Sequence, residues 1–227
     1  MNHPIWRRKP NTHISLLILL ILICIAAACT TPANPETSPV PTPESQILRD
    51  DFSSPNPAWA LFDTDAVAAY VQDEELFLED RGQGIAVYSP LMEKRYDDVE
   101  VQVQARHVQG SMNNWMGVIC RLQNESNYYL LAVSADGYYL IQRVEDDVVT
   151  PLVGPEFSEA VNIGKSQNDI IARCEGNTFS LRVNDTLLVT RSDDVATAGG
   201  QIALFADAVD AGSSTVAAFD DLVLSTP

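Results

Sequence analysis

Apolar and polar residues alternate with a period of two along much of the chain after residue 46. The clearest case is YDDVEVQVQARHV at 96–108, in which Val99, Val101, Val103 and Ala105 face one way. The residues of its opposite face are polar: Glu100, Gln102, Gln104 and Arg106. Such alternation is typical of a β-strand that is buried on one face only.

Further strand-like segments recur at short intervals, separated by turn residues, which is the all-β pattern. About twelve strands with short loops predict two packed antiparallel sheets, a sandwich or jelly roll. Only FSEAVNIG at 157–164 has room for one helical turn. The other predicted strands lie at 46–52, 67–72, 75–80, 84–89, 115–123, 168–176, 178–185, 186–192, 199–207 and 214–225, with a hairpin at 127–142.

That hairpin, NYYLLAVSADGYYLIQ, carries two tyrosine pairs on either side of a Ser-Ala-Asp-Gly turn, whose glycine suits the left-handed position. Counting outward from the turn puts Tyr129 and Tyr139 on one surface and Tyr128 and Tyr138 on the other. At strand rise, the two tyrosines of one surface lie roughly 18–20 Å apart. One sugar ring cannot touch both, so core packing is favoured over ligand stacking for these side chains.

The chain opens with the pattern of a secretory signal. A cationic stretch, Arg7 to Lys9, precedes an apolar run at 14–25, three alanines and Cys29. A cysteine in this place resembles the bacterial lipobox, although Ala26 stands where that motif prefers leucine. The resemblance implies cleavage after residue 28 and acyl chains such as palmitate on Cys29.

An uncleaved membrane-spanning anchor is the alternative. The apolar stretch at 14–28 is about fifteen residues, short of the roughly twenty that span a bilayer. Two or more acyl chains hold a protein stably to a membrane. We therefore expect an extracytoplasmic lipoprotein, anchored to the cell membrane or the outer membrane.

Composition divides the rest of the chain in two. Residues 29–46 are rich in Pro, Thr and Ser and predict a disordered linker. Residues 47–227 suit one sandwich domain. Removing residues 1–28 takes away three cationic residues and no acidic one, so the formal charge goes from −17 to −20. Such a surface repels nucleic acid, which is not an expected partner.

Several segments together resemble the concanavalin A-like jelly roll, in the branch shared by laminin G-like domains and the 3-keto-disaccharide hydrolase domain. They are an opening DDF with a following Trp, GVICRLQNESNYYLLAVSADGYYLIQ, NDIIARCEGNTFSLRVND, GGQIALFAD and VAAFDDLVL. The likeness covers most of residues 47–225. Its motifs are structural, so it implies the fold more strongly than a function. The family usually has Asn-Gly where this chain has Asn184-Asp185.

Cys120 and Cys174 are the cysteines left once Cys24 is removed and Cys29 is lipidated. An exported domain meets oxidising conditions, so an even pair predicts a disulfide. Strand parity points both side chains into the interior, and the resembled family often has cysteines at these places. The alternative is two separate buried thiols.

A ligand site is predicted on the polar face of 96–108, if that strand neighbours 115–123 in one sheet. Trp115 would then lie among amides and charges, the mixture that glycan sites use. A solvated sheet face with a tryptophan at its rim is the alternative. The candidate ligand-binding residues are Trp115, Arg121, Glu100, Gln102 and Gln104.

Catalytic patterns are scarce. His107 is the one histidine left after the signal, and neither a Gly-x-Ser-x-Gly elbow nor the Glu-x-Asp-x-x-Glu strand of jelly-roll glucanases occurs. Acidic pairs such as Asp220-Asp221 are too sparse to indicate calcium. We expect no cofactor and no enzymatic activity.

Three functions remain open at this point. The first is a membrane-anchored domain that binds an extracellular glycan without turning it over. The second is a hydrolase or lyase acting on modified disaccharides, implied by the family's name. The third is an adhesion or structural module that meets other proteins.

Overall fold

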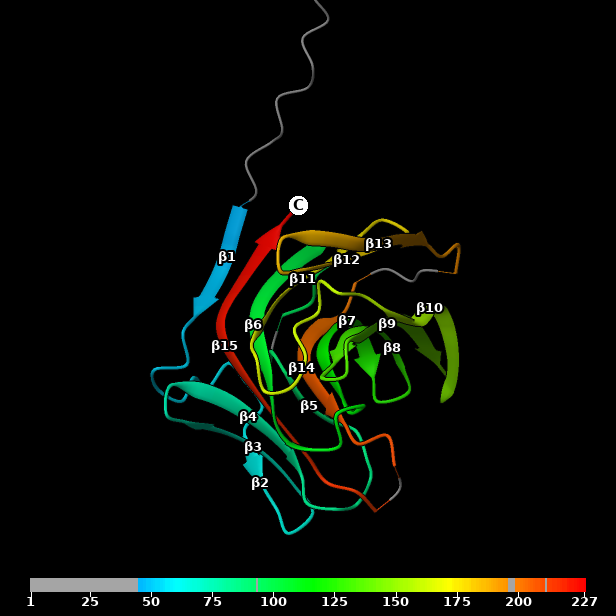
Figure 1. Cartoon of the computed structure of the whole chain (residues 1–227). Helices are drawn as coiled ribbons and strands as arrows, with labels where there is room; N and C mark the ends of the chain where they lie inside the picture. Colours follow the sequence, from blue (N-terminus) through cyan, green and yellow to red (C-terminus); the bar gives the residue numbers. More distant parts are fainter. Residues whose placement is uncertain (1–44, 93, 196–198, 211) are drawn as a thin grey trace, which may run out of the picture. The chain divides into compact units, whose positions relative to one another are not determined.

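The computed structural model describes residues 45–92, 94–195, 199–210 and 212–227, and its regular elements are all β-strands (Figure 1). The predicted signal segment, Cys29 and the linker up to residue 44 lie outside the described residues. The first strand begins at Ser45, two residues before the predicted start of the domain. No helix formed by the described residues is long and apolar enough to cross a membrane.

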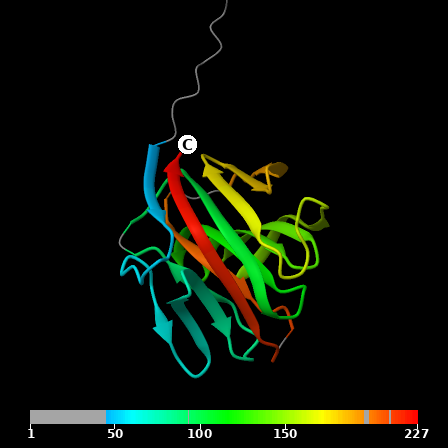
Figure 2. The ribbon, with the colours of Figure 1, turned by 60° about the vertical axis from the view of Figure 1, so that its left-hand side comes forward.

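The strands form two antiparallel sheets, as the alternation of the sequence predicts. In order, the larger sheet contains β13 (Thr186–Ser192), β12 (Thr178–Val183), β11 (Asn168–Glu175), β6 (Val99–Gly110), β15 (Thr215–Thr226), β4 (Glu75–Asp80), β3 (Val67–Gln72) and β2 (Phe62–Asp63), with β1 (Ser45–Asp50) paired to β15. The smaller sheet contains β10 (Val148–Phe157), β9 (Tyr138–Glu145), β8 (Asn127–Ser134), β7 (Trp115–Asn124), β14 (Gln201–Asp207) and β5 (Val87–Pro90). Figure 2 shows β1, β15, β6 and β11 side by side in the larger sheet.

The main core lies between the two sheets. The larger sheet contributes Val99, Val101 and Val103 of β6, each at most 1% exposed, while the residues between them are half-buried on the outer face. The predicted inward face of this strand is confirmed. The Cys120–Cys174 disulfide is confirmed too, and it joins β7 of one sheet to β11 of the other with the Cα atoms 6.8 Å apart.

The predicted geometry of the tyrosine hairpin is confirmed. Tyr129 pairs with Arg143 and Val133 with Tyr139 across β8 and β9, and Gly137 in the turn has a φ of 96°. In the β12–β13 turn, Asn184 and Asp185 have φ of 46° and 65°, a conformation that both residue types tolerate.

Two local predictions were wrong or incomplete. Strand β10 was not predicted, because Pro151, Gly154 and Pro155 argue against a strand; it is an edge strand, where proline is tolerated. Residues 158–164 form turns instead of a helical turn, with the Val161 N–H donating to the Ser158 carbonyl at 3.2 Å.

The opening DDF and the following tryptophan form one buried network. Asp50 is 8% exposed, and its carboxylate accepts hydrogen bonds from the Phe52 N–H at 3.0 Å and the Trp59 indole at 2.9 Å. The Asn56 amide donates to the same carboxylate at 2.7 Å. The rings of Phe52 and Trp59 lie 5.9 Å apart, so this carboxylate fixes the loop against the core.

Candidate functional site

The predicted site on the polar face of β6 does not form, because β6 and β7 belong to different sheets. Alternation shows that a strand has two faces, but it does not show which sheet the strand joins. The face that contains Glu100, Gln102 and Gln104 is therefore the outer face of the larger sheet. Trp115 lies on the other sheet.

The polar side chains of β6 bond to their own neighbours in the larger sheet. Glu100 lies 3.4 Å from the Arg173 guanidinium, which also pairs with Glu175 at 2.9 Å. The Gln102 amide donates to Asp169 at 3.1 Å. Gln104 is half-buried opposite Asp169 and Asp220. These contacts are typical of a solvated sheet face.

Arg121 was predicted to share the face of Trp115, and that prediction was wrong. Its φ of 54° accompanies a register shift in β7, a β-bulge that reverses the alternation after Cys120. The guanidinium turns inward, 4% exposed, over the Phe179 ring at 5.2 Å and bonded to the Gly176 carbonyl. A Cβ on Gly200 would lie 2.3 Å from the backbone carbonyl carbon of Arg121, so the bulge in β7 requires glycine at position 200.

The outer face of the smaller sheet has an apolar floor. Tyr88, Trp115 and Tyr128, each half-buried, pack over this floor. The floor is formed by residues of β7, β8, β9 and β14. These residues are Ile119, Leu122, Leu130, Ala132, Leu140, Ala203 and Phe205, none more than 6% exposed.

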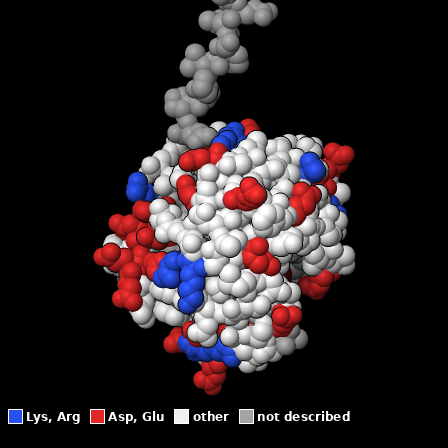
Figure 3. Space-filling view, in the orientation of Figure 1, with Lys and Arg blue, Asp and Glu red and all other residues white. Residues whose placement is uncertain are grey.

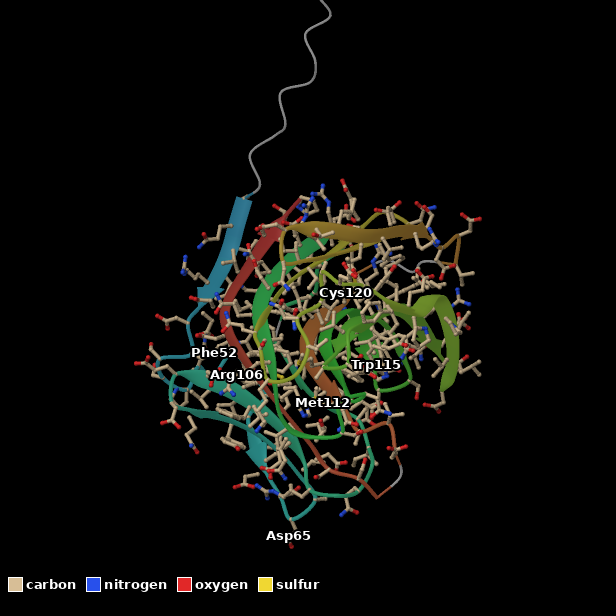
Figure 4. All side chains as sticks on the ribbon, in the orientation of Figure 1. Phe52, Asp65, Arg106, Met112, Trp115 and Cys120 are labelled. Atoms are coloured by element: carbon tan, nitrogen blue, oxygen red, sulfur yellow. A yellow bond between two sulfur atoms is a disulfide. The ribbon has the colours of Figure 1, made fainter. Side chains whose placement is uncertain are left out.

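A pocket of about 300 Å³ opens at the Trp115 end of this face. Trp115 and Tyr138 are its aromatic lining residues, and Tyr138 is 39% exposed. The Asn113 Oδ1 has no hydrogen-bond partner and is buried within the pocket wall, so it is not exposed at the pocket surface. Figure 4 labels Trp115 and, in the loop before it, Met112. The full lining is Asn113, Trp115, Ser134, Asp136, Tyr138, Pro155 and Val209.

Hydrogen bonds to backbone groups hold the loops around the pocket. Asn114 donates to the Ser214 carbonyl at 3.1 Å and accepts from the Val209 N–H at 3.2 Å, which ties the two loops that flank Trp115. The turn at Gly137 accepts a bond from the Ser158 N–H at 3.0 Å. Phe157 packs edge-on against Tyr138, with the centroids 5.7 Å apart. The pocket is therefore largely preformed.

Of the four hairpin tyrosines, one of each pair serves the core. Tyr129 stacks on Phe179 at 4.1 Å and donates to Asp193, and Tyr139 is 7% exposed. Core packing, favoured for all four, holds for these two. Tyr138 instead lines the pocket, and Tyr128 packs over the apolar floor.

The electrostatics of this face are acidic. Asp207 lies opposite Trp115 in the β14–β7 register, and burial, followed by the charge of Asp80, raises its pKa to about 6. Burial, then the charge of Asp207, raises the pKa of Tyr128. Burial, then the charge of Glu125, raises the pKa of Tyr88. Among the described residues, no group of three or more His, Cys, Asp and Glu could hold a metal ion.

Comparison with known proteins shows the fold. No family model matches the chain, and no curated protein does. The structure is similar to the carbohydrate-binding module CBM66 from Bacillus subtilis, with a TM-score of 0.60 and 15% identity over 74% of this chain and 96% of that one. The domain has the fold of a two-sheet jelly-roll sandwich.

Two further solved structures share this jelly roll. A β-glucanase from Bacillus licheniformis has a TM-score of 0.56 and 10% identity over 82% of this chain and 100% of that one. A Bacillus subtilis protein of unknown function with a galectin-like fold has a TM-score of 0.56 and 11% identity over 80% of this chain and 96% of that one. At these identities, the likeness extends to the fold alone.

Sequence reasoning missed most of the pocket. Asn113 and Asp136 lie in loops, where no periodicity indicates the direction of a side chain. Asp207 carried a readable signal, because Ala203, Phe205 and Asp207 share one face of an otherwise apolar strand. A lone acid at the end of such a face indicates that the face ends in a functional or solvated position.

Proposed function

We propose that the jelly roll binds carbohydrate, without turning it over, in the pocket beside Trp115 and Tyr138. The observation that carries the proposal is the make-up of this pocket: two accessible aromatic rings beside the carboxylate of Asp136. Aromatic faces suit the C–H side of a sugar ring, and polar groups suit its hydroxyls. The similarity to a structure named as a carbohydrate-binding module supports the proposal.

Trp115→Ala should weaken glycan binding by roughly 5- to 150-fold, because a central aromatic anchor contributes on the order of 1–3 kcal/mol. A glycan array with the full-length chain identifies ligands, and calorimetry then measures the variant. Tyr70→Ala is the matched control. It truncates a half-buried aromatic that stacks on Phe77 in the larger sheet, and it should leave the affinity unchanged.

An array without hits would refute glycan binding. Equal ligand affinities for wild type and Trp115→Ala would refute binding in this pocket.

Incubation of the wild type with the glycans that it binds also tests catalysis. Asp207 favours the alternative of a hydrolase, since a carboxyl with a raised pKa beside a ligand pocket is typical of a general acid. New reducing ends released by the wild type and lost in Asp207→Asn would replace the non-catalytic proposal with that alternative.

We further propose that the chain is a lipoprotein whose lipidated Cys29 anchors the jelly roll to a membrane. The signal pattern that ends at Cys29 supports this anchoring. Cys29→Ser should move the protein from the membrane fraction to the soluble fraction in cell fractionation, because the thiol that receives lipid is lost. Membrane retention of this variant in full would contradict the proposal.

A further inference from the structure

The pocket beside Trp115 combines aromatic walls with a carboxylate. Asp136 lines the pocket and accepts a hydrogen bond from the Ser134 hydroxyl. Among the described residues that line the pocket, none is Lys or Arg. The lining therefore offers a hydrogen-bond acceptor to a ligand that brings donors.

The charges next to Trp115 have the same sign. Asp207 lies opposite Trp115 in the β14–β7 register, and the charge that acts on Asp207 is that of Asp80. Figure 3 shows that the acidic groups, in red, are spread more widely over the visible face than the basic groups, in blue.

One described cation lies in the loop that supports the turn. Gly164 of that loop donates to the Ala135 carbonyl at 2.8 Å, and Lys165 follows it. The Lys165 charge acts on His107, whose pKa is lowered mainly by burial. Lys165 is not among the residues that line the pocket.

We infer that the glycan taken by this pocket carries a free amino group, so that the ligand class is the amino sugars in their ammonium form. This inference rests on the proposed carbohydrate binding. An ammonium donates three hydrogen bonds and accepts none, which matches the carboxylate of Asp136. It is also attracted to the faces of Trp115 and Tyr138. Anionic glycans meet repulsion from the same acids.

Three trisaccharides with one β-1,4 backbone test the inference, because they differ only at C2: glucosamine, N-acetylglucosamine and glucose oligomers. Calorimetry with the full-length chain, at a pH where the amine is protonated, should show the glucosamine oligomer binding roughly ten-fold tighter than the other two. The preference should shrink as salt approaches about 1 M, where charges more than about 3 Å apart are screened.

Asp136→Asn should remove most of the preference for the amine, since it replaces the carboxylate by a neutral amide of the same shape. Asp65→Asn is the matched control. It makes the same charge change at an exposed site, labelled in Figure 4 at the far end of the domain from Trp115, and it should keep the preference. Thermal unfolding of both variants confirms that each is folded.

The outcomes separate this inference from the proposed function. Equal binding of the three trisaccharides, tighter binding of a neutral one, or a preference that survives Asp136→Asn would overturn the amino-sugar inference and leave carbohydrate binding intact. An absence of glycan binding on the array would instead remove the proposed function and this inference together.

Discussion

The Cys120→Ala/Cys174→Ala double variant should lose roughly 4 kcal/mol of its free energy of unfolding. The two cysteines are 54 residues apart in the sequence, and the chain-entropy model assigns about this value to a closed loop of that length. The effect is large because the bond closes a long loop, and its loss gives that segment of the unfolded chain more conformational freedom. Denaturant unfolding of the full-length chain measures the change.

The matched control for this prediction is the wild type treated with reductant, which should be destabilised by a similar amount. Reductant should leave the double variant unchanged. If the unfolded but unreduced wild type instead titrated with free thiols at Cys120 and Cys174, the disulfide and the prediction would both be wrong.

Asp50→Ala should cost about 2–4 kcal/mol of unfolding free energy. The carboxylate accepts three hydrogen bonds in a buried place, and its removal leaves the Trp59 indole N–H without an acceptor. An unsatisfied buried donor is expensive, and bonds to a charged group are stronger than neutral ones. Thermal or denaturant unfolding measures the loss, and near-ultraviolet circular dichroism should show a looser Trp59.

Asp51→Ala provides the control for Asp50→Ala at the neighbouring position. Asp51 is exposed, and its bond from the Ser53 N–H at 3.1 Å lies at the surface. Its removal should leave the free energy of unfolding close to that of the wild type. Equal losses for the two variants would show that the network around Asp50 is not what secures the opening loop.

The sequence predicts the fold well where side chains alternate and turns have a defined chemistry. The inward valines of β6, the register of the tyrosine hairpin and the Asn184-Asp185 turn all follow from local rules. The disulfide follows from parity, because Cys120 precedes the bulge in β7. Each of these depends on neighbours along the chain, which a single sequence records.

The site is much less predictable, because it depends on neighbours in space. Periodicity placed Trp115 on an outward face, but it could not show that β6 and β7 belong to different sheets. One positive φ at Arg121 reversed the alternation and moved a predicted ligand residue into the interior. Asn113 and Asp136 enter the pocket from separate loops, whose meeting depends on how β6, β7, β8 and β9 are arranged.

The pairing of β1 with β15 has a consequence for how such a domain can be combined with others. Ser45 lies directly opposite Thr226, and Figures 1 and 2 show these two strands ending together. The chain therefore enters and leaves the jelly roll at one point of one sheet. A unit with adjacent entry and exit can be inserted into a surface loop of another protein, or have its ends joined and reopened elsewhere, with little rearrangement of either partner. A domain of this architecture is thus suited to insertion into other proteins during recombination.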